Sequence, residues 1–134
     1  MPNAYIFPKN AFNRIRRAAD KADLRELCYA LFGKGSRVMQ VVRIPNRADD
    51  DVMHSEVDFR DVERTRRRLK ILDLHFLGFL HTHPTSRAVP GKGDIRGNEV
   101  GSLMFIYADC YEELRAFRRV HESPGYVEKR VLII

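Results

Sequence analysis

The feature that most constrains this chain is an apolar run that ends in two histidines two residues apart. The run is Phe76–Leu80, and His81-Thr82-His83-Pro84 follows it directly. A short apolar run of this kind predicts a buried β-strand, and residues two apart in a strand point to the same face. The two histidines are therefore expected side by side. Pro84 closes the strand there, because proline has no N–H to give to the ladder.

A loop rich in proline and glycine separates the histidines from the next carboxylate, Asp94. Residues 84–93 show no apolar periodicity, so they predict a loop of fixed shape. Two neutral imidazoles, one carboxylate and an open fourth position are the ligand set of a catalytic zinc site. The sequence therefore predicts one zinc ion bound by His81, His83 and Asp94. The alternative is that the histidines only close the strand with ordinary hydrogen bonds.

A second carboxylate lies far upstream in an otherwise apolar segment. Glu26 opens the run Glu26–Gly33 and falls within a predicted strand over Leu24–Phe32. A carboxylate in such a run is unfavourable to bury unless it has a partner. Glu26 is therefore either an exposed residue at the strand edge or part of a polar site.

Together these stretches resemble the JAMM/MPN+ zinc metalloproteases, in their small single-domain prokaryotic form. That family carries a glutamate, then His-x-His-Pro, a short loop and Ser-x-x-Asp. Here Glu26 and Gly33 match the family's first-strand glutamate and its trailing glycine. The two histidines and Asp94 match the metal ligands, and Pro90 matches the proline before the motif serine. The serine position itself is Gly91, which departs from the family pattern.

The resemblance implies a zinc-dependent peptidase, similar to deubiquitinases. It would cut peptide or isopeptide bonds at the C-terminus of ubiquitin-like or sulfur-carrier proteins. It also implies that Glu26 is the catalytic base, which activates a zinc-bound water and then protonates the leaving amine. The family's serine stabilises the oxyanion of the reaction, and Gly91 has no side chain for this role. The candidate donors are Ser86, Thr85, Lys92 and a backbone N–H of the loop.

The size and composition of the chain are those of an intracellular globular domain. A chain of 134 residues can form a single core, so residues 1–134 are expected to be one JAMM/MPN metalloprotease-like domain. Met1–Asn10 has no long apolar stretch, and no segment approaches the length of a membrane span. These features favour a cytoplasmic protein without a membrane partner. Cys28 and Cys110 lie in apolar runs and are predicted to be buried free thiols.

The net charge of +6 and the isoelectric point near 9.6 favour acidic partners, nucleic acid included. The basic residues are spread over three main segments, 14–17, 64–70 and 115–119, and no nucleic-acid-binding motif accompanies them. We therefore interpret them as solvated faces, and nucleic acid is not the expected partner. The sequence leaves the oligomeric state open, a homodimer included.

Hydrophobic periodicity predicts an α/β fold, a mixed β-sheet flanked by two main helices, and the resemblance adds a cytidine-deaminase-like MPN architecture. One helix is expected to start at Asn10, whose side chain would cap it, and another to cover Asp61–Asp73. Ile95–Gly101 gives at most one or two helical turns. Tyr111–His121 has a helix as its alternative, because apolar residues recur there every three positions. Strands are expected at Tyr5–Phe7, Leu24–Phe32, Val38–Ile44, Val52–Phe59, Phe76–His83, Leu103–Ala108, Leu114–Val120 and Tyr126–Ile134.

Three functions are compatible with these observations, and the zinc isopeptidase is favoured. The second is a non-catalytic MPN-type module for protein interaction. Such modules usually lose ligands, whereas all three ligands and Glu26 are present here, and only Gly91 supports this function. The third is a nucleic-acid-processing protein built on the same motif, which the basic charge suggests. Salt-dependent binding to DNA or RNA would distinguish it from the other two.

Overall fold

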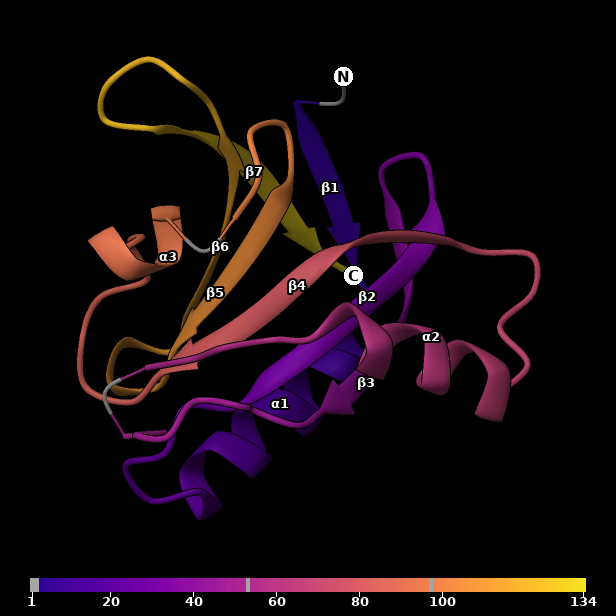
Figure 1. Ribbon diagram of the computed structural model, residues 1–134, viewed down its shortest axis with the longest axis horizontal. Helices are drawn as coiled ribbons and strands as arrows, with labels where there is room; N and C mark the ends of the chain where they lie inside the picture. Colours follow the sequence, from indigo (N-terminus) through magenta and orange to yellow (C-terminus); the bar gives the residue numbers. More distant parts are fainter. Residues whose placement is uncertain (1–2, 53, 97) are drawn as a thin grey trace.

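A mixed β-sheet that closes into a barrel forms the body of the protein in a computed structural model that describes residues 3–52, 54–96 and 98–134 (Figure 1). The strands are β1 (Ala4–Phe7), β2 (Cys28–Lys34), β3 (Arg37–Ile44), β4 (His75–His83), β5 (Leu103–Ala108), β6 (Glu113–Arg119) and β7 (Tyr126–Ile133). The helices are α1 (Lys9–Lys21), α2 (Phe59–Arg68) and α3 (Lys92–Arg96), with a 3₁₀ turn, η1, at Asp109–Tyr111.

The order of strands around the barrel is β1-β3-β2-β4-β5-β6-β7, and β7 pairs back to β1. The pairs β1–β3, β1–β7 and β4–β5 run parallel, and the other described pairs run antiparallel. The predicted mixed sheet with two main helices is confirmed. The structure adds the closure of the sheet and a third, short helix, and the cytidine-deaminase-like architecture stays a prediction. None of the described helices is both long and apolar enough to cross a lipid bilayer.

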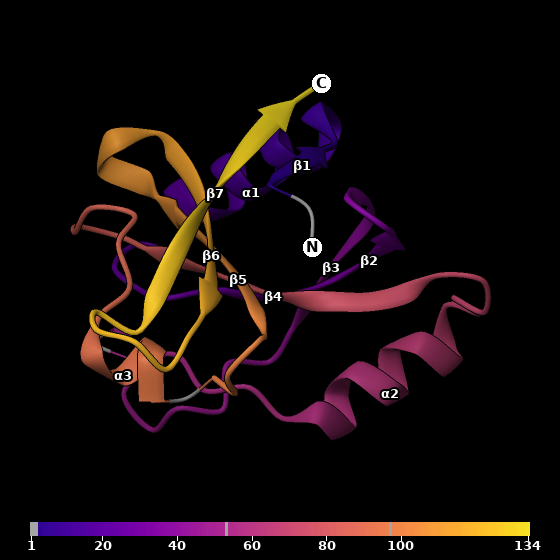
Figure 2. The same ribbon diagram turned by 90° about the horizontal axis from the view of Figure 1, so that it is seen from above.

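The sheet is buried on both faces where β2, β4 and β5 lie side by side. Leu31 of β2 belongs to the core under α1, whereas Phe32 packs with Val62 of α2 in a second core. In Figure 2, α1 lies above β4 and α2 lies below it. α1 turns Ile15 and its neighbouring alanines inward, as the helical spacing of apolar residues predicts. Covering both faces fixes β4, the strand that carries the two histidines.

Both main helices differ from their predicted bounds. α1 begins at Lys9, with Pro8 extended at the N-cap and no side-chain hydrogen bond there. Asn10 therefore lies inside the first turn and does not cap the helix. A proline before the helix removes no internal hydrogen bond, since the first N–H groups have no partner within it. α2 is capped instead by the side chain of Asp58, which accepts a hydrogen bond from Arg60 N, and it ends well before Asp73.

The predicted strand over Val52–Phe59 is wrong for the described residues. This part forms no regular strand up to the start of α2, and Met53 lies outside the described residues. The side chain of Asn46 takes the place of a partner strand. Its Oδ1 accepts a hydrogen bond from Glu56 N, and its Nδ2 donates one to the carbonyl of His54. Alternation of polar and apolar residues cannot distinguish such a loop from a strand, because a side-chain amide satisfies the same backbone groups.

The strand predicted over Leu114–Val120 is confirmed as β6, and the helix alternative for Tyr111–His121 is wrong. β6 pairs with β5 on one side and β7 on the other. Ala116 and Phe117 are consecutive and both buried, in different core clusters. A strand buried on both faces loses its alternation, which explains why the sequence pattern was ambiguous.

The two cysteines differ in burial, so one prediction is wrong. Cys28 is a buried free thiol, as expected, and burial raises its pKa to about 12. Cys110 is a free but exposed thiol in η1, and its Sγ donates a 3.0 Å hydrogen bond to the carbonyl of Pro84. The apolar run of β5 ends before it, and the 3₁₀ turn directs its side chain outward.

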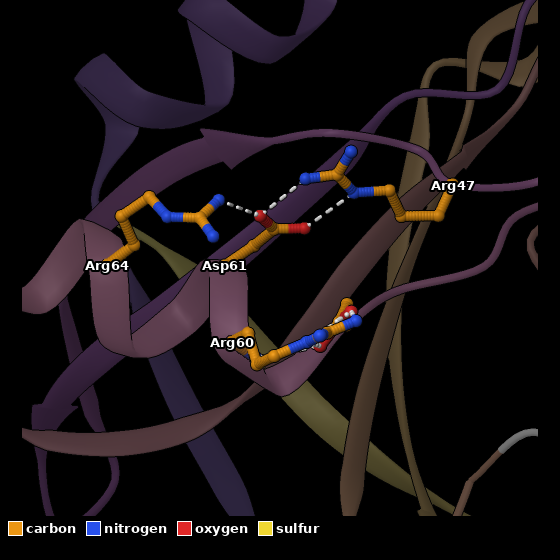
Figure 3. A network of polar contacts seen from close by, with 5 residues as sticks. Arg47, Arg60, Asp61 and Arg64 are labelled. Atoms are coloured by element: carbon orange, nitrogen blue, oxygen red, sulfur yellow. Dashed lines mark hydrogen bonds and ion pairs between the residues drawn. The ribbon is translucent and has the colours of Figure 1, made fainter.

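A buried aspartate ties α2 to the chain that follows β3. Asp61 is 4% exposed and accepts two hydrogen bonds from Arg47, at 2.9 and 2.7 Å, and one from Arg64, at 2.9 Å (Figure 3). A buried carboxylate requires such partners, and the hydrogen bonds from Arg47 hold its pKa below the ordinary value. Since Arg47 and α2 flank the 48–58 loop, this network fixes both ends of the loop.

Candidate metal centre

β4 presents His81 and His83 from the middle of the sheet. Cys28 of β2 pairs with His81 on one side, and Ile106 of β5 pairs with it on the other. The two imidazole rings lie on the same face, with centroids 4.9 Å apart, and each residue is 7% exposed. A strand with neighbours on both sides holds its side chains rigidly, which suits a binding site that needs fixed ligands.

Asp94 of α3 faces both histidines, with one carboxylate oxygen toward each ring. The Nε2 atoms of His81 and His83 lie 3.1 Å apart. Oδ1 of Asp94 lies 3.2 Å from the first, and Oδ2 lies 3.3 Å from the second. With zinc–ligand bonds of about 2.0–2.1 Å and tetrahedral geometry, neighbouring ligand atoms lie about 3.3 Å apart. These spacings are compatible with one zinc ion held by the three side chains.

Backbone groups fix how His83 and Asp94 are presented. Nδ1 of His83 lies 2.8 Å from the carbonyl oxygen of Arg87. A carbonyl only accepts, so Nδ1 carries the proton and Nε2 of the neutral ring presents its lone pair. The N–H of Gly91 donates to Oδ2 of Asp94 at 2.8 Å. Nε2 of His83 and a carboxylate oxygen at this distance repel unless a proton or a metal ion lies between them.

The loop after His83 is anchored to the start of β6. Glu113 accepts hydrogen bonds from the side chain of Arg87, at 3.0 Å, and from the N–H of Ala88, at 3.1 Å. The guanidinium of Arg87 also lies 4.8 Å from the centroid of the Tyr111 ring. These contacts hold the Arg87 carbonyl that orients His83. The loop therefore has the fixed shape that its composition indicates.

Glu26 lies directly before β2 and beside the two histidines. The strand predicted from Leu24 begins only at Cys28, so Glu26 belongs to an extended segment outside the ladder. Its N–H donates to the carbonyl of Asp51 at 2.6 Å, and its carbonyl accepts from Nδ2 of Asn46 at 3.1 Å. Glu26 is 9% exposed, and its carboxylate and the ligand nitrogens of both histidines all lie within 4.8 Å of one another.

The sequence also matches a described family over most of its length. Residues 8–120 match the model of the prokaryotic homologues of the JAB domain. The chain belongs to this family. The resemblance to small prokaryotic JAMM/MPN proteins is thereby confirmed, and the family region contains all four side chains of the candidate centre.

Relatives of this JAB-domain protein include one curated enzyme and several solved structures. A desampylase of Pyrococcus furiosus is 24% identical over 112 residues, which cover 84% of this chain and 79% of the desampylase. The solution structure of a Desulfitobacterium hafniense protein superposes with a TM-score of 0.80 at 20% identity, covering 98% and 92% of the two chains. A structure described as JAMM, a metalloprotease-like zinc site in the proteasome and signalosome, has a TM-score of 0.58 at 18% identity, with 96% and 97% covered. These two structures show that the fold is shared.

In this JAB-domain protein, two of the three candidate ligands, His83 and Asp94, line a cleft of about 580 Å³. Of the residues considered as oxyanion donors, Ser86 and Gly91 line the cleft. Thr85 in the loop and Lys92 at the start of α3 are not among its lining residues. The complete lining is Glu26, His54, Ser55, His83, Ser86, Arg87, Val89, Gly91, Gly93 and Asp94.

Two residues that connect the parts of the site, Thr82 and Asn46, were not identified from the sequence. Thr82 lies between the two histidines, and its Oγ1 accepts a 2.8 Å hydrogen bond from Leu27 N. Its own N–H donates to the Leu27 carbonyl at 3.0 Å, which couples the histidine strand to the segment of Glu26. Alternation along β4 was a usable signal for Thr82, because its side chain must point to the face opposite the two imidazoles. Nothing in the sequence places Asn46 beside Glu26.

Burial and neighbouring charges shift the pKa values of the site in different directions. Burial raises the pKa of Glu26, and the nearby histidines offset only part of this effect. Burial would also raise the pKa of Asp94, but the neighbouring His81 and His83 and the N–H of Gly91 together outweigh this effect and hold that pKa far below its ordinary value. One carboxylate is therefore suited to remain ionised as a ligand, and the other is suited to exchange a proton.

Proposed function

We propose that this JAB-domain protein is a zinc-dependent peptidase of the JAMM type, with residues 1–134 acting as one metalloprotease domain. The observation that carries the proposal is the spacing of ligand atoms on His81, His83 and Asp94, at 3.1–3.3 Å, beside the buried Glu26. A structural neighbour described as having a metalloprotease-like zinc site supports the choice of zinc.

In this proposal the side chains divide the chemistry between them. His81, His83 and Asp94 would hold a zinc ion, which would supply Lewis-acid chemistry by polarising a carbonyl and lowering the pKa of water to about 7. Glu26 takes a proton from the attacking water and delivers it to the leaving amine. Its raised pKa suits this role, because a proton carrier works best when its pKa approaches the working pH. The Arg87 carbonyl and the Gly91 N–H keep His83 and Asp94 aligned throughout.

The proposed substrate is a peptide or isopeptide bond at the C-terminus of a ubiquitin-like or sulfur-carrier protein. The relative named as a desampylase supports an enzyme acting on a protein modifier. The cleft, about 580 Å³ and flanked by the 84–91 loop, offers room for an extended terminal segment. A cytoplasmic location and a homodimer stay predictions.

Metal content and hydrolysis together test this function. The purified protein is expected to carry one zinc per chain and to cleave a reporter fused to the C-terminal glycine of a sulfur-carrier protein. A chelator should abolish cleavage and leave the far-UV circular dichroism unchanged, because the apolar barrel forms its own core. Readdition of zinc should restore activity. Zinc-loaded protein that binds modifiers without cleaving them would instead favour an interaction module, and salt-dependent binding to DNA or RNA would favour the nucleic-acid alternative.

Gly91→Ser should raise kcat, by up to the order of 10²-fold, because it adds a hydroxyl donor where the family has one. The backbone permits the change, since Gly91 does not adopt a positive φ. A Cβ there would meet only Oδ2 of Asp94, at an ordinary 3.6 Å. The serine also keeps the N–H that holds Asp94. The measurement is kcat on the reporter fusion, with zinc content determined for each preparation.

Gly91→Ala is the matched control, because it adds the same Cβ without a hydroxyl. Equal activities of the serine and alanine variants would show that the hydroxyl supplies no donor at this position. Ser86→Ala then shows whether a donor is already present, since Ser86 lines the same cleft. A large loss in Ser86→Ala would explain a small gain in Gly91→Ser.

A further inference from the structure

A second concavity, of about 460 Å³, lies between α1 and β3 and is lined by basic side chains. Arg14, Arg17 and Lys21 project from one face of α1, where residues three and four apart are neighbours. Arg43 of β3 and Arg25, from the segment after α1, complete the set. All five side chains are exposed. We call this concavity the basic pocket.

The basic pocket gathers positive charge that the chain itself does not neutralise. Apart from Arg25, none of its basic residues forms an ion pair within the part of the chain that the structure describes, and Arg25 lies 4.0 Å from Asp51. In the other basic segments some residues are paired, since Arg64 pairs with Asp61 and Arg115 pairs with Glu128. Like charges held together repel, so an acidic partner would relieve this repulsion.

The basic pocket adjoins a smaller pocket, which in turn adjoins the cleft of the metal centre. Arg25, Leu27 and Arg43 line both the smaller pocket and the basic pocket. Glu26 lines both the smaller pocket and the cleft. A protein whose terminal bond lies beside Glu26 would therefore cover the basic pocket with an adjoining part of its surface.

We propose that the basic pocket docks an acidic segment on the surface of the protein substrate, next to the bond that is cut. The inference rests on the proposed function, and it adds the charge of the substrate and where that substrate binds. Complementary charge of this kind speeds association and selects among partners, while the chemistry stays at the metal centre. Part of the total charge of +6 would therefore serve to bind the substrate, although the arginines concerned are dispersed along the sequence.

The lining of the basic pocket favours an acidic protein over nucleic acid. Its remaining residues are Ala18, Ala22 and Leu27, so no aromatic ring of the described residues lines it. Single-stranded nucleic acid is usually held by stacking on aromatic rings, and a duplex by a long track of phosphate contacts. A short concavity with a small apolar floor instead suits one or two carboxylate side chains.

The test reverses charge at Arg14 and Arg43 and measures cleavage and binding separately. Arg14→Glu/Arg43→Glu and the neutral Arg14→Gln/Arg43→Gln are compared with Arg68→Glu, an exposed residue of α2 outside the basic pocket. The cleavage probe is a sulfur-carrier protein of net negative charge, fused through its C-terminal glycine to a fluorescent reporter. The binding probes are the same carrier, labelled and unfused, and a labelled single-stranded oligonucleotide, both followed by anisotropy over a range of salt.

The double reversal should raise KM and the carrier Kd on the order of ten-fold or more, with kcat within about two-fold and a weaker salt dependence. The neutral pair should show an intermediate effect, and Arg68→Glu should match the wild type. Cleavage with unchanged KM and Kd would overturn the docking site and leave the proposed function intact. Binding that depends on the basic pocket without any cleavage would leave the docking site intact and overturn the function. Loss of oligonucleotide binding alone would assign the pocket to nucleic acid and overturn the inference.

Discussion

Glu26→Gln is expected to bind zinc as the wild type does and to turn over its substrate roughly 10²–10⁴-fold more slowly. Glutamine keeps the size of the side chain but cannot accept a proton at its amide. The metal ligands on β4 and α3 stay in place, because the backbone contacts of Glu26 to Asp51 and Asn46 do not involve its carboxylate. The measurements are kcat on the reporter fusion and zinc content by mass spectrometry.

Glu122→Gln is the matched control, an exposed glutamate in the turn between β6 and β7. It should retain full activity with the same change of charge. Zinc loss in Glu26→Gln would show that Glu26 acts as a ligand. Its carboxylate is close enough for this role, within 4.8 Å of the ligand nitrogens of both histidines. Full activity with zinc retained would remove Glu26 from the mechanism.

The histidine strand was predictable because local sequence determines it almost completely. An apolar run, a strand period of two and a terminating proline fix the direction of both imidazoles. The structure places their ring nitrogens 3.1 Å apart on β4. The position of Asp94 followed from the resemblance to the JAMM family, because a loop over residues 84–93 could extend far from the strand. The orientation of Asp94 by the Gly91 N–H was not predictable, because that hydrogen bond depends on the path of the loop.

The surroundings of Glu26 could not be predicted, because they depend on contacts between distant segments. The sequence suggested a strand through Glu26, whereas the structure places it in an extended segment before β2. Asn46 holds that segment from a loop 20 residues away. The same side chain organises the 54–58 segment, which alternation wrongly predicted as a strand. One asparagine amide therefore accounts for both discrepancies.

The basic pocket could not be predicted from the sequence either, because its residues come from separate elements. Arg14 and Arg17 were assigned to a solvated helix face, which is correct for each residue by itself. Only the packing of α1 beside β3 brings them together with Arg43 and Arg25. Closure of the barrel was unpredictable for the same reason, because it depends on pairing between β7 and β1, which lie at opposite ends of the chain. Periodicity identifies elements, and it carries no information on which of them meet.

His83→Ala is expected to abolish stoichiometric zinc binding and, with it, hydrolysis. The substitution removes one of the three proposed ligands. Nε2 of His83 lies 3.1 Å from that of His81 and 3.3 Å from Oδ2 of Asp94. Loss of an outer partner of a metal ligand already lowers metal affinity roughly 10–100-fold, so loss of the ligand itself should exceed this. The wild type should gain about 2.7 kcal/mol of stability at a zinc concentration 100-fold above Kd, since zinc binds only the folded site. The variant should gain none.

His75→Ala is the matched control, because His75 is exposed at the opposite end of the same strand. Thermal melts with and without zinc compare the three proteins, and the shift produced by zinc is independent of any substrate. His75→Ala should keep that shift, and His83→Ala should lose it while still unfolding cooperatively in the absence of zinc. A zinc-dependent shift that survives in His83→Ala would place the ion elsewhere. The 3.1 Å approach of the two histidines would then be ordinary packing at a strand end.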